Sequence, residues 1–335
     1  MKVIGFSFGR KYGNSETLVK EALMACEEKG LEVEFVRMNE FVLEACTVCN
    51  GFCQPQWDYC PHKDDAHFLM KHFLESDGYI IGAPVYSKTP CSLAMVFRDR
   101  CFGPKMDRGA WLKRGEPEWA QGGSKNRAGG LISVGGAPSH HWVSLGIQSL
   151  YTTCFSAQTT VVDLMDVMCH ADMGAAAIDD ELIARAHRLG ESVADAVITG
   201  DNAWRGDDGY ACPICHQNFV ELKPGTNKTE CPICGALGHL EFDEEKGVTI
   251  VIDDLHQNVF SVDGLVFHTE ETHGVRENIY NPRKHLVDDR LKKYKEWDMY
   301  NLKSPTKEAR KQAILDRMAA EGKGKTDGSS ADQNS

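Results

Sequence analysis

The chain has 335 residues, of which 42% are hydrophobic and 26% are charged, so it can bury one large core with a smaller module or two cores of ordinary size. Its formal net charge of -12 argues against a nucleic-acid-binding surface, because contacts to phosphates need clustered lysine and arginine.

The cysteines point to chemistry in a reducing compartment. The chain starts with a strand-like run where a secreted protein would carry a signal peptide, and no run approaches the roughly 20 apolar residues of a membrane span. We therefore expect a cytoplasmic protein whose 13 cysteines are thiols, metal ligands or redox centres. Eight of them form two tight clusters. The other five are expected to be small buried apolar residues: Cys26, Cys91, Cys101, Cys154 and Cys169.

The chain opens with a strand, a loop and a helix. Residues 2–7 predict a buried parallel strand, and residues 8–17, with their glycines and hydroxyl side chains, open a helix that runs to about Lys29. Asn14 or Ser15 can cap this helix, which leaves backbone N–H groups pointing outward where a phosphate can bind. The alternative is a capped helix without a ligand.

The alternation of strands and helices continues to about residue 198. Strands are predicted at residues 31–37, 78–82, 128–134 and 159–164. Helices are predicted at residues 64–74 and 92–101, at a segment that ends near residue 155, and at 179–198. Residues 103–127 are predicted to be a long loop rather than a packed element. Five strands that alternate with helices predict an α/β fold with a doubly wound parallel sheet, which binds ligands beyond the carboxyl ends of its strands.

The first cysteine cluster follows the second predicted strand. Its four members lie within fifteen residues: Cys46, Cys49, Cys53 and Cys60. A reducing compartment disfavours structural disulfides, so this loop is predicted to hold a metal or redox centre.

The second cluster consists of two Cys-x-x-Cys knuckles separated by fifteen residues: Cys212, Cys215, Cys231 and Cys234. Four thiolates at this spacing fit one tetrahedral ion, and so small a segment needs the ion to fold. Zinc ribbons and rubredoxins share this arrangement, and His216 stands where rubredoxins usually have glycine, which favours zinc with iron as the alternative. Residues 248–252 and 259–267 are predicted to add strands to this module.

Three separate loops, in this order along the chain, carry a family resemblance. They are Arg10-x-x-Gly13-Asn14-Ser15, the cysteine loop that ends Cys60-Pro-His-Lys-Asp64-Asp65, and Ala83-Pro84-Val85-Tyr86 followed by Phe97-Arg98-Asp99-Arg100. Together they resemble the flavodoxin-like NADPH-dependent FMN reductase family and, within it, the iron–sulfur flavoproteins. The resemblance covers roughly residues 1–198.

The resemblance implies an FMN site and an iron–sulfur site. It assigns the FMN phosphate to Ser7, Arg10, Asn14, Ser15 and Thr17. It places the isoalloxazine along Pro84, Val85, Tyr86 and Ser87, with Gly135 and Gly136 on its other side. It also suggests that Cys46, Cys49, Cys53 and Cys60 bind a 4Fe-4S cluster, the alternatives being a zinc ion or uncoordinated thiols. His140 and His141 either contact a nicotinamide or substrate or are plain surface histidines.

The predicted organisation has four parts. Residues 1–200 form a flavodoxin-like FMN-binding domain with the cysteine-rich loop 46–60, and residues 208–268 form a zinc-ribbon or rubredoxin-like module. Residues 269–320 form a helical extension, and residues 321–335 a disordered tail. The resemblance implies a homodimer or homotetramer, and we expect the ribbon and the extension to serve its formation.

The sequence therefore predicts an FMN-dependent oxidoreductase. It would pass electrons between a reduced donor (NAD(P)H or a ferredoxin-like protein), FMN and a 4Fe-4S cluster, and on to an acceptor that the sequence does not identify. No catalytic side chain is assigned. Two other functions are consistent with the same motifs: a flavodoxin-like electron carrier without a small-molecule substrate, and a redox-responsive module that binds another protein.

Overall fold

The computed structural model describes residues 1–47, 60–103, 105–207, 212–245 and 247–300, together with isolated positions between 302 and 317. Cys49, Cys53 and the predicted tail 321–335 lie outside these residues. The chain divides into two units, Met1–Thr272 and His273–Ser335, which we describe one at a time. Within the described residues, no helix has both the length and the apolar character that crossing a bilayer requires.

Five parallel strands form the centre of the first unit. They are β1 (Lys2–Ser7), β2 (Glu32–Arg37), β3 (Gly78–Tyr86), β5 (Arg127–Val134) and β6 (Thr159–Val167), in the order β2-β1-β3-β5-β6. The two-residue strand β4 (Thr89–Pro90) pairs with the end of β3 in the antiparallel direction. The predicted doubly wound sheet is confirmed, and β3 and β6 run four and three residues further than expected.

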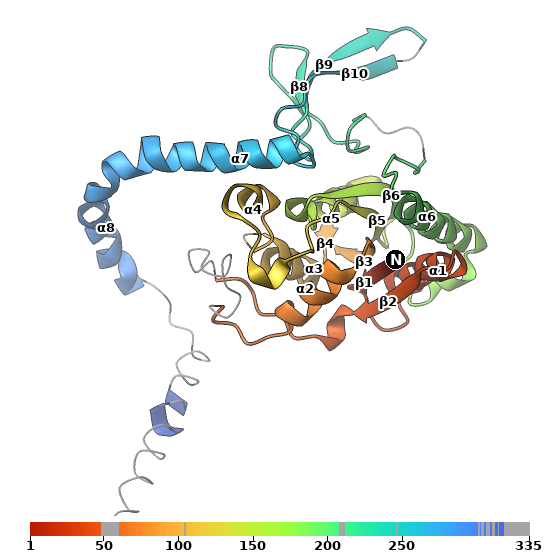
Figure 1. Ribbon diagram of the computed structural model, residues 1–335, viewed down its shortest axis with the longest axis horizontal. Helices are drawn as coiled ribbons and strands as arrows, with labels where there is room; N and C mark the ends of the chain where they lie inside the picture. Colours follow the sequence, from red (N-terminus) through yellow and green to blue (C-terminus); the bar gives the residue numbers. More distant parts are fainter. Residues whose placement is uncertain are drawn as a thin grey trace, which may run out of the picture. The chain divides into compact units, whose positions relative to one another are not determined.

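Two apolar layers cover the sheet. Helices α1 (Asn14–Glu28) and α6 (Asp180–Thr199) pack on one face, and α2 (Ala66–Glu75), α3 (Ser92–Phe97) and α5 (Gly146–Tyr151) on the other (Figure 1). Gly190 lets α1 and α6 approach closely, because a Cβ at this position would lie 2.0 Å from the Ala22 carbonyl oxygen. Four of the five scattered cysteines are buried as expected, whereas Cys169 is exposed, so the prediction was wrong for that residue.

The prediction of a loop at residues 103–127 was wrong. This segment contains α4 (Arg108–Arg114) and a 3₁₀ turn at Glu118–Ala120, and its Trp111 and Trp119 rings meet edge to face with centroids 5.6 Å apart. Asp107 begins α4 by accepting a hydrogen bond from the Ala110 N–H. The high content of Gly, Lys and Arg is typical of a loop, but the packing of Trp111 on Trp119 and the Asp107 cap stabilise helix α4.

The second cysteine cluster opens a small antiparallel sheet in the order β10-β9-β8-β7. Its strands are β7 (Glu221–Leu222), β8 (Lys228–Glu230), β9 (Leu237–Asp243) and β10 (Gly247–Asp254). The strand predicted at residues 248–252 is therefore confirmed. The strand predicted at 259–267 is wrong, because α7 (Val262–Val275) begins there, with the Ser261 hydroxyl accepting a hydrogen bond from the Gly264 N–H.

The second unit, where the sequence analysis predicts a helical extension at residues 269–320, is helical in its described part up to Tyr300. After the last residues of α7 it contains short turns at Arg276–Tyr280 and Asn281–Leu286, helix α8 (Val287–Glu296) and a turn at Trp297–Tyr300. No described residue between 273 and 296 is buried.

A buried ion pair joins α1 to β2, and it generates a prediction about acid stability. Hydrogen bonds from Arg37 and, less strongly, Lys20 lower the pKa of the Glu16 carboxyl to about 2 against the opposing effect of burial. Arg37 Nε and Nη2 each lie 2.8 Å from a Glu16 carboxylate oxygen. Because the folded pKa lies below the ordinary value of 4.5, the pair stabilises the fold above pH 4.5, and this stabilisation is lost as pH falls toward 2.

We therefore expect Glu16→Gln to destabilise the fold at pH 7 by up to about 3 kcal/mol, with the difference from wild type shrinking below pH 4.5. Urea unfolding at pH 7, 5, 4 and 3 measures this difference. Glu27→Gln, on the exposed side of the same helix, is the matched control and should change stability little at any pH. A Glu16→Gln penalty that stays constant down to pH 3 would contradict the account.

Candidate functional site

A cavity of about 270 Å³ opens at the carboxyl ends of the parallel strands. Its wall is formed by the segments after β1 and β6, by the last residues of β3, and by the end of β5 with the turn that follows. The lining residues are Gly9, Arg10, Gly13, Asn14, Ser15, Pro84, Val85, Tyr86, Val134, Gly136, His170 and Ala171. This is the edge at which open α/β sheets bind ligands. Seven of the eleven residues predicted for the FMN site line the cavity, namely Arg10, Asn14, Ser15, Pro84, Val85, Tyr86 and Gly136.

The amino end of α1 forms one end of the cavity. We expected Asn14 or Ser15 to cap this helix, and that was wrong: Gly13 is the N-cap residue, and no side chain caps the helix. The first-turn N–H groups and the positive end of the helix dipole therefore remain available to an anion.

Small residues line the approach to this helix end. A Cβ on Gly9 would lie 3.3 Å from Ser15 Oγ and 3.8 Å from Ser7 Oγ, so a larger residue would fill the space between the two hydroxyls. Ser7 is fully buried, and its Oγ has no hydrogen-bond partner among the described residues. A buried hydroxyl without a partner is costly unless a ligand supplies one. Thr17, in contrast, donates its hydroxyl to the Gly13 carbonyl and does not line the cavity.

The Asn14 side chain holds the segment after β6 against the cavity. Its Nδ2 donates to the carbonyl oxygens of His170 and Asp172, both at 2.8 Å, and its Oδ1 accepts from the Ala176 N–H at 3.1 Å. Both amide protons are thus used within the protein, and Asn14 can offer a phosphate only its backbone N–H.

His170 is a cavity residue that the sequence analysis missed. Its Nδ1 lies 2.6 Å from the Met168 carbonyl oxygen and its Nε2 lies 3.1 Å from Asp179 Oδ2. Asp179 also begins α6 by accepting from the Leu182 N–H, and these bonds lower the pKa of its carboxyl. The signal that could have found His170 is its position just after the fifth parallel strand, at the edge where the other loops end.

A tight hairpin bounds the other side of the cavity. Tyr86 lines the cavity with a ring that is 58% exposed. Ser87 and Lys88 have φ values of 51° and 76°, the left-handed region that two-residue hairpin turns require and that usually selects Gly or Asn. Ser87 therefore lies in the turn between β3 and β4 and does not line the cavity.

The Gly135–Gly136 pair is shaped by protein packing. A Cβ on Gly135 would lie 2.2 Å from a Val143 methyl group, and a Cβ on Gly136 would lie 2.7 Å from that of Ala171. Gly136 lines the cavity and Gly135 does not. His140 and His141 are both exposed and do not line it.

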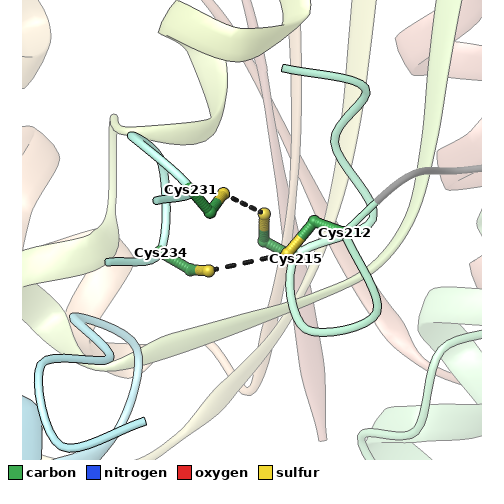
Figure 2. A group of neighbouring side chains, drawn as sticks. All are labelled: Cys212, Cys215, Cys231 and Cys234. Carbon is green, nitrogen blue, oxygen red and sulfur yellow. Dashed lines mark hydrogen bonds between the residues drawn. The ribbon is translucent and has the colours of Figure 1, made fainter. Parts of the chain in front are cut away.

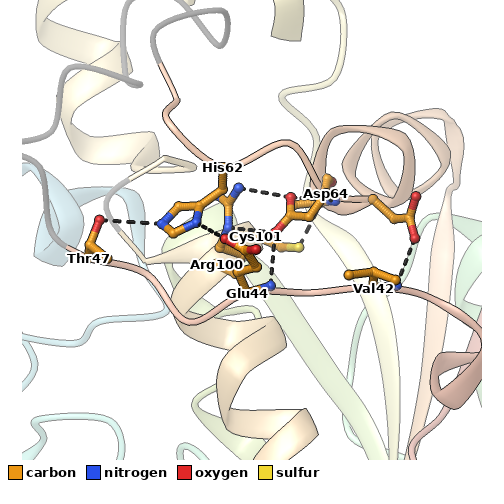
Figure 3. Close-up of polar contacts among 9 residues, drawn as sticks. Val42, Glu44, Thr47, His62, Asp64, Arg100 and Cys101 are labelled. Atoms are coloured by element: carbon orange, nitrogen blue, oxygen red, sulfur yellow. Dashed lines mark hydrogen bonds and ion pairs between the residues drawn. The ribbon is translucent and has the colours of Figure 1, made fainter. Parts of the chain in front are cut away.

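Asp64 ties together the two ends of the first cysteine loop (Figure 3). Its buried carboxylate accepts from Arg100 Nε at 3.0 Å and Nη2 at 2.9 Å, and also from the Glu44 N–H at 3.0 Å. His62 adds a second tie, because its ring nitrogens hydrogen-bond to Glu44 and to Thr47. The described ends of the loop are therefore fixed to the core.

Arg100 also faces the last cysteine of this loop. Burial lowers the pKa of the Arg100 guanidinium, but its interactions with the neighbouring Asp64 and Cys60 raise this pKa by more, so the net shift is upward. Arg100 Nη1 is buried without a hydrogen-bond partner among the described residues. Cys60 is buried and Cys46 partly exposed, and both flank the undescribed Cys49 and Cys53.

The four cysteines of the second cluster point toward one another (Figure 2). All are buried, and their sulfur atoms lie within 4.8 Å of one another, with Cys215–Cys231 at 3.5 Å and Cys212–Cys234 at 3.7 Å. Mutual hydrogen bonds lower the pKa of Cys212 and raise the pKa of Cys215 and Cys234, because one thiolate in the group is stabilised by its protonated neighbours. The set has the donor number and chemistry of a tetrahedral metal site.

The two knuckles have the same backbone form. In each, the first cysteine donates its N–H to the residue five positions on, and the residue after the second cysteine donates back to the first. That residue has a positive φ in both, 57° at His216 and 78° at Gly235. His216 compensates for its strained conformation by stacking on Trp204, with ring centroids 4.1 Å apart.

Helix α5 contacts both the second cysteine cluster and the cavity wall. At its end, Tyr151 meets the Phe260 ring at 5.0 Å, and its pKa is raised by burial and by the nearby Cys215 and its neighbours. At its start, a Cβ on Gly146 would lie 2.6 Å from a methyl group of Val85, which lines the cavity. The four cysteines and Tyr151 belong to one buried cluster.

Comparisons with known proteins match this chain to flavoprotein families. Residues 1–145 match the family described as NADPH-dependent FMN reductase. An iron–sulfur flavoprotein of Methanocaldococcus jannaschii is 32% identical over 206 residues, which cover 59% of this chain and 97% of that protein. The flavone synthase cfoJ of Aspergillus candidus is 28% identical over 288 residues, 81% of this chain and 88% of that protein.

A solved structure described as flavone reductase shares the fold. It superposes with a TM-score of 0.71 at 23% identity and covers 91% of this chain and 99% of that one. The chain therefore belongs to the NADPH-dependent FMN reductase family, with iron–sulfur flavoproteins among its homologues, and it is an oxidoreductase.

Proposed function

We propose that this protein is an FMN-dependent oxidoreductase that takes electrons from NAD(P)H or a reduced redox protein and delivers them to an acceptor at the sheet-edge cavity. The observation that carries the proposal is the cavity end at α1, where an uncapped helix, the gap beside Gly9 and the unpartnered Ser7 hydroxyl suit a phosphate dianion. FMN, when bound, accepts a hydride as an electron pair and can release electrons singly.

The side chains around the amino end of α1 favour the binding of an anion there. Glu16, in the first turn of α1, would repel a phosphate, but its charge is neutralised by Arg37 and Lys20. Arg10 supplies a cation at the cavity wall. Asn14 fixes the segment 168–176, so that His170 and Ala171 close the wall opposite Pro84 and Val85 without depending on the ligand.

The proposal includes two metal centres. We assign a 4Fe-4S cluster to Cys46, Cys49, Cys53 and Cys60. Its support is the iron–sulfur flavoprotein relatives, the fixed loop ends and the buried Arg100 guanidinium beside Cys60. We assign zinc, with iron as the alternative, to Cys212, Cys215, Cys231 and Cys234. A reducing, cytoplasmic compartment and a homodimer or homotetramer complete the proposal.

The acceptor is proposed to be a planar, conjugated aromatic ketone. The relative that matches 81% of the chain is named a flavone synthase, and the solved structure that covers 91% of it is described as flavone reductase, the direction in which a flavone accepts electrons. The half-exposed Tyr86 ring at the cavity offers a flat surface on which such a molecule can stack. The alternative is an electron carrier that has no small-molecule acceptor.

Anaerobic mixing of the FMN-loaded protein with NADPH or NADH tests the reductase. We expect rapid bleaching of the flavin absorbance, followed by re-oxidation when a flavone is added and not when the 2,3-saturated flavanone is added. Bleaching without re-oxidation by the flavone would remove the proposed acceptor. A flavin that neither nucleotide reduces, but reduced ferredoxin does, would identify a carrier instead.

Ser7→Ala tests the phosphate site, because it should weaken FMN binding without lowering the stability of the FMN-free protein. Removing a hydrogen bond to a charged group should weaken FMN binding roughly tenfold or more. Removing a buried, unpartnered hydroxyl should leave the stability of the FMN-free protein unchanged or slightly higher. Ser156→Ala is the control: neither serine lines the cavity and both hydroxyls are buried without a partner among the described residues, but Ser7 Oγ lies next to the cavity residue Gly9, whereas Ser156 lies in the 3₁₀ turn Phe155–Ala157. Equal FMN affinity in Ser7→Ala, measured by fluorescence quenching, would contradict the assignment.

Metal and sulfide analysis of anaerobically purified protein tests the two centres separately. We expect about four irons with sulfide and about one zinc per chain. Cys60→Ser should lose iron and sulfide and keep the zinc, whereas Cys212→Ser should lose the zinc and keep the iron. About one iron without sulfide, lost only in Cys212→Ser, would show that the redox metal lies in the second cluster.

A further inference from the structure

The turn between β1 and α1 presents an aromatic ring to solvent in a backbone conformation that is unfavourable for it. Gly13 donates its N–H to the Arg10 carbonyl oxygen at 2.9 Å, which closes a four-residue turn over residues 10–13. Tyr12 occupies the third position of this turn with a φ of 59°, where Gly or Asn is usual. It is 64% exposed. A large exposed ring at a strained position points to a function rather than to packing.

Three cations hold the Tyr12 ring in place. The ammonium nitrogens of Lys11 and Lys20 lie 5.1 Å and 5.5 Å from the ring centroid, and the Arg37 guanidinium carbon lies 5.9 Å from it. Glu16, which is buried, neutralises Lys20 and Arg37 through ion pairs and thereby anchors both to the core. The position of the ring is therefore set by side chains that are themselves fixed.

Arg10 and Lys11 are the cations of this turn whose charge is available to a ligand. Both are exposed, and neither has an acidic partner among the described residues. Arg10 lines the FMN cavity, whereas Lys11 and Tyr12 do not, so these two residues lie just outside it. In a chain with a net charge of -12, this local excess of positive charge favours an anion.

The proposed hydride donor is an anion of suitable chemistry. A nicotinamide nucleotide brings its nicotinamide ring to FMN, and its adenosine end stays outside the cavity that FMN fills. The exposed Tyr12 ring offers a flat face on which adenine can stack, and the Lys11 ammonium offers a cation for a phosphate. NADPH carries a phosphate on the 2′-oxygen of its adenosine ribose, where NADH has a hydroxyl group.

We propose that Lys11 and Tyr12 bind the adenosine end of NADPH, with the Tyr12 ring stacked on the adenine and the Lys11 ammonium paired with the 2′-phosphate. The inference rests on the proposed function and specifies its electron donor. The strain at Tyr12 agrees with this role, because Gly would suit the turn better but has no ring to offer.

Titration calorimetry of the FMN-loaded protein with 2′,5′-ADP and with 5′-AMP tests the two contacts separately, because only 2′,5′-ADP has the 2′-phosphate. Lys11→Ala should weaken the binding of 2′,5′-ADP about tenfold and leave that of 5′-AMP unchanged. Tyr12→Gly should weaken the binding of both about tenfold, because both stack through adenine. Equal affinity of 2′,5′-ADP for wild type and Lys11→Ala would overturn the inference.

Matched variants separate ligand binding from a structural role of the turn. Tyr12→Gly relieves the strained φ, so the stability of the protein to urea should stay equal or rise; a clear loss of stability would make the ring structural and overturn the inference. Tyr12→Phe keeps the ring and should restore the binding of both nucleotides. Lys29→Ala, after the other end of α1, removes a cation paired with Asp195 and should change neither affinity. FMN affinity should be equal in all variants, since none of these residues lines the cavity.

Flavin bleaching by NADPH and by NADH separates this inference from the proposed function. Lys11→Ala should raise the NADPH concentration for half-maximal bleaching about tenfold and leave that for NADH unchanged. If it changes both equally, the reductase stands and the inference is overturned. If neither nucleotide bleaches the flavin but 2′,5′-ADP binds as predicted, the reductase fails and the nucleotide site stands. If wild type does not bind 2′,5′-ADP and an acidic redox protein reduces the flavin through Lys11, the turn serves a protein donor and the inference is overturned.

Discussion

Five strands that run in the same direction bring their carboxyl ends to one edge of the sheet, and the site depends on this constraint. Residues at the ends of β1, β3, β5 and β6 or just after them are far apart in sequence but line one cavity. Backbone hydrogen bonds already join them in pairs: the Phe8 N–H donates to Gly82, and the Gly135 N–H to Val167. The Asn14 amide then ties the last of these segments to the first. The cavity is thus built before any ligand enters it.

Much of the sheet and the grouping of Cys212, Cys215, Cys231 and Cys234 could be predicted from sequence, because buried strands and cysteine spacings are local patterns. The wrong predictions have a common physical cause: they depend on contacts between residues that the local sequence pattern does not reveal. Residues 259–267 have the composition of a strand, yet Ser261 caps a helix there, and a Cβ on Gly264 would lie 1.9 Å from the Asn258 carbonyl oxygen. His170 was missed for the same reason, since its role depends on Asp179 and on the edge where β6 ends.

Buried ion pairs stand beside two of the three proposed cofactor sites, those for FMN and the 4Fe-4S cluster. Glu16 in the first turn of α1 pairs with Arg37, and Asp64 pairs with Arg100 at the described ends of the first cysteine loop. Such pairs contribute modest net stability, because desolvating two charges offsets much of their attraction. Their geometry is directional, however: the Asp64 carboxylate joins Arg100 to the Glu44 N–H and thereby fixes where the loop leaves and re-enters the core. Their main effect is to position these segments.

Helix α5 makes the ribbon part of the architecture of the oxidoreductase domain. Tyr151 and the four buried cysteines share one apolar cluster, so a shortened chain that stopped near residue 200 would leave this side of the helix open to water. Removal of the ribbon would therefore change the domain itself, because the Tyr151 ring on α5 would lose its contact with Phe260, whose ring centroid lies 5.0 Å away.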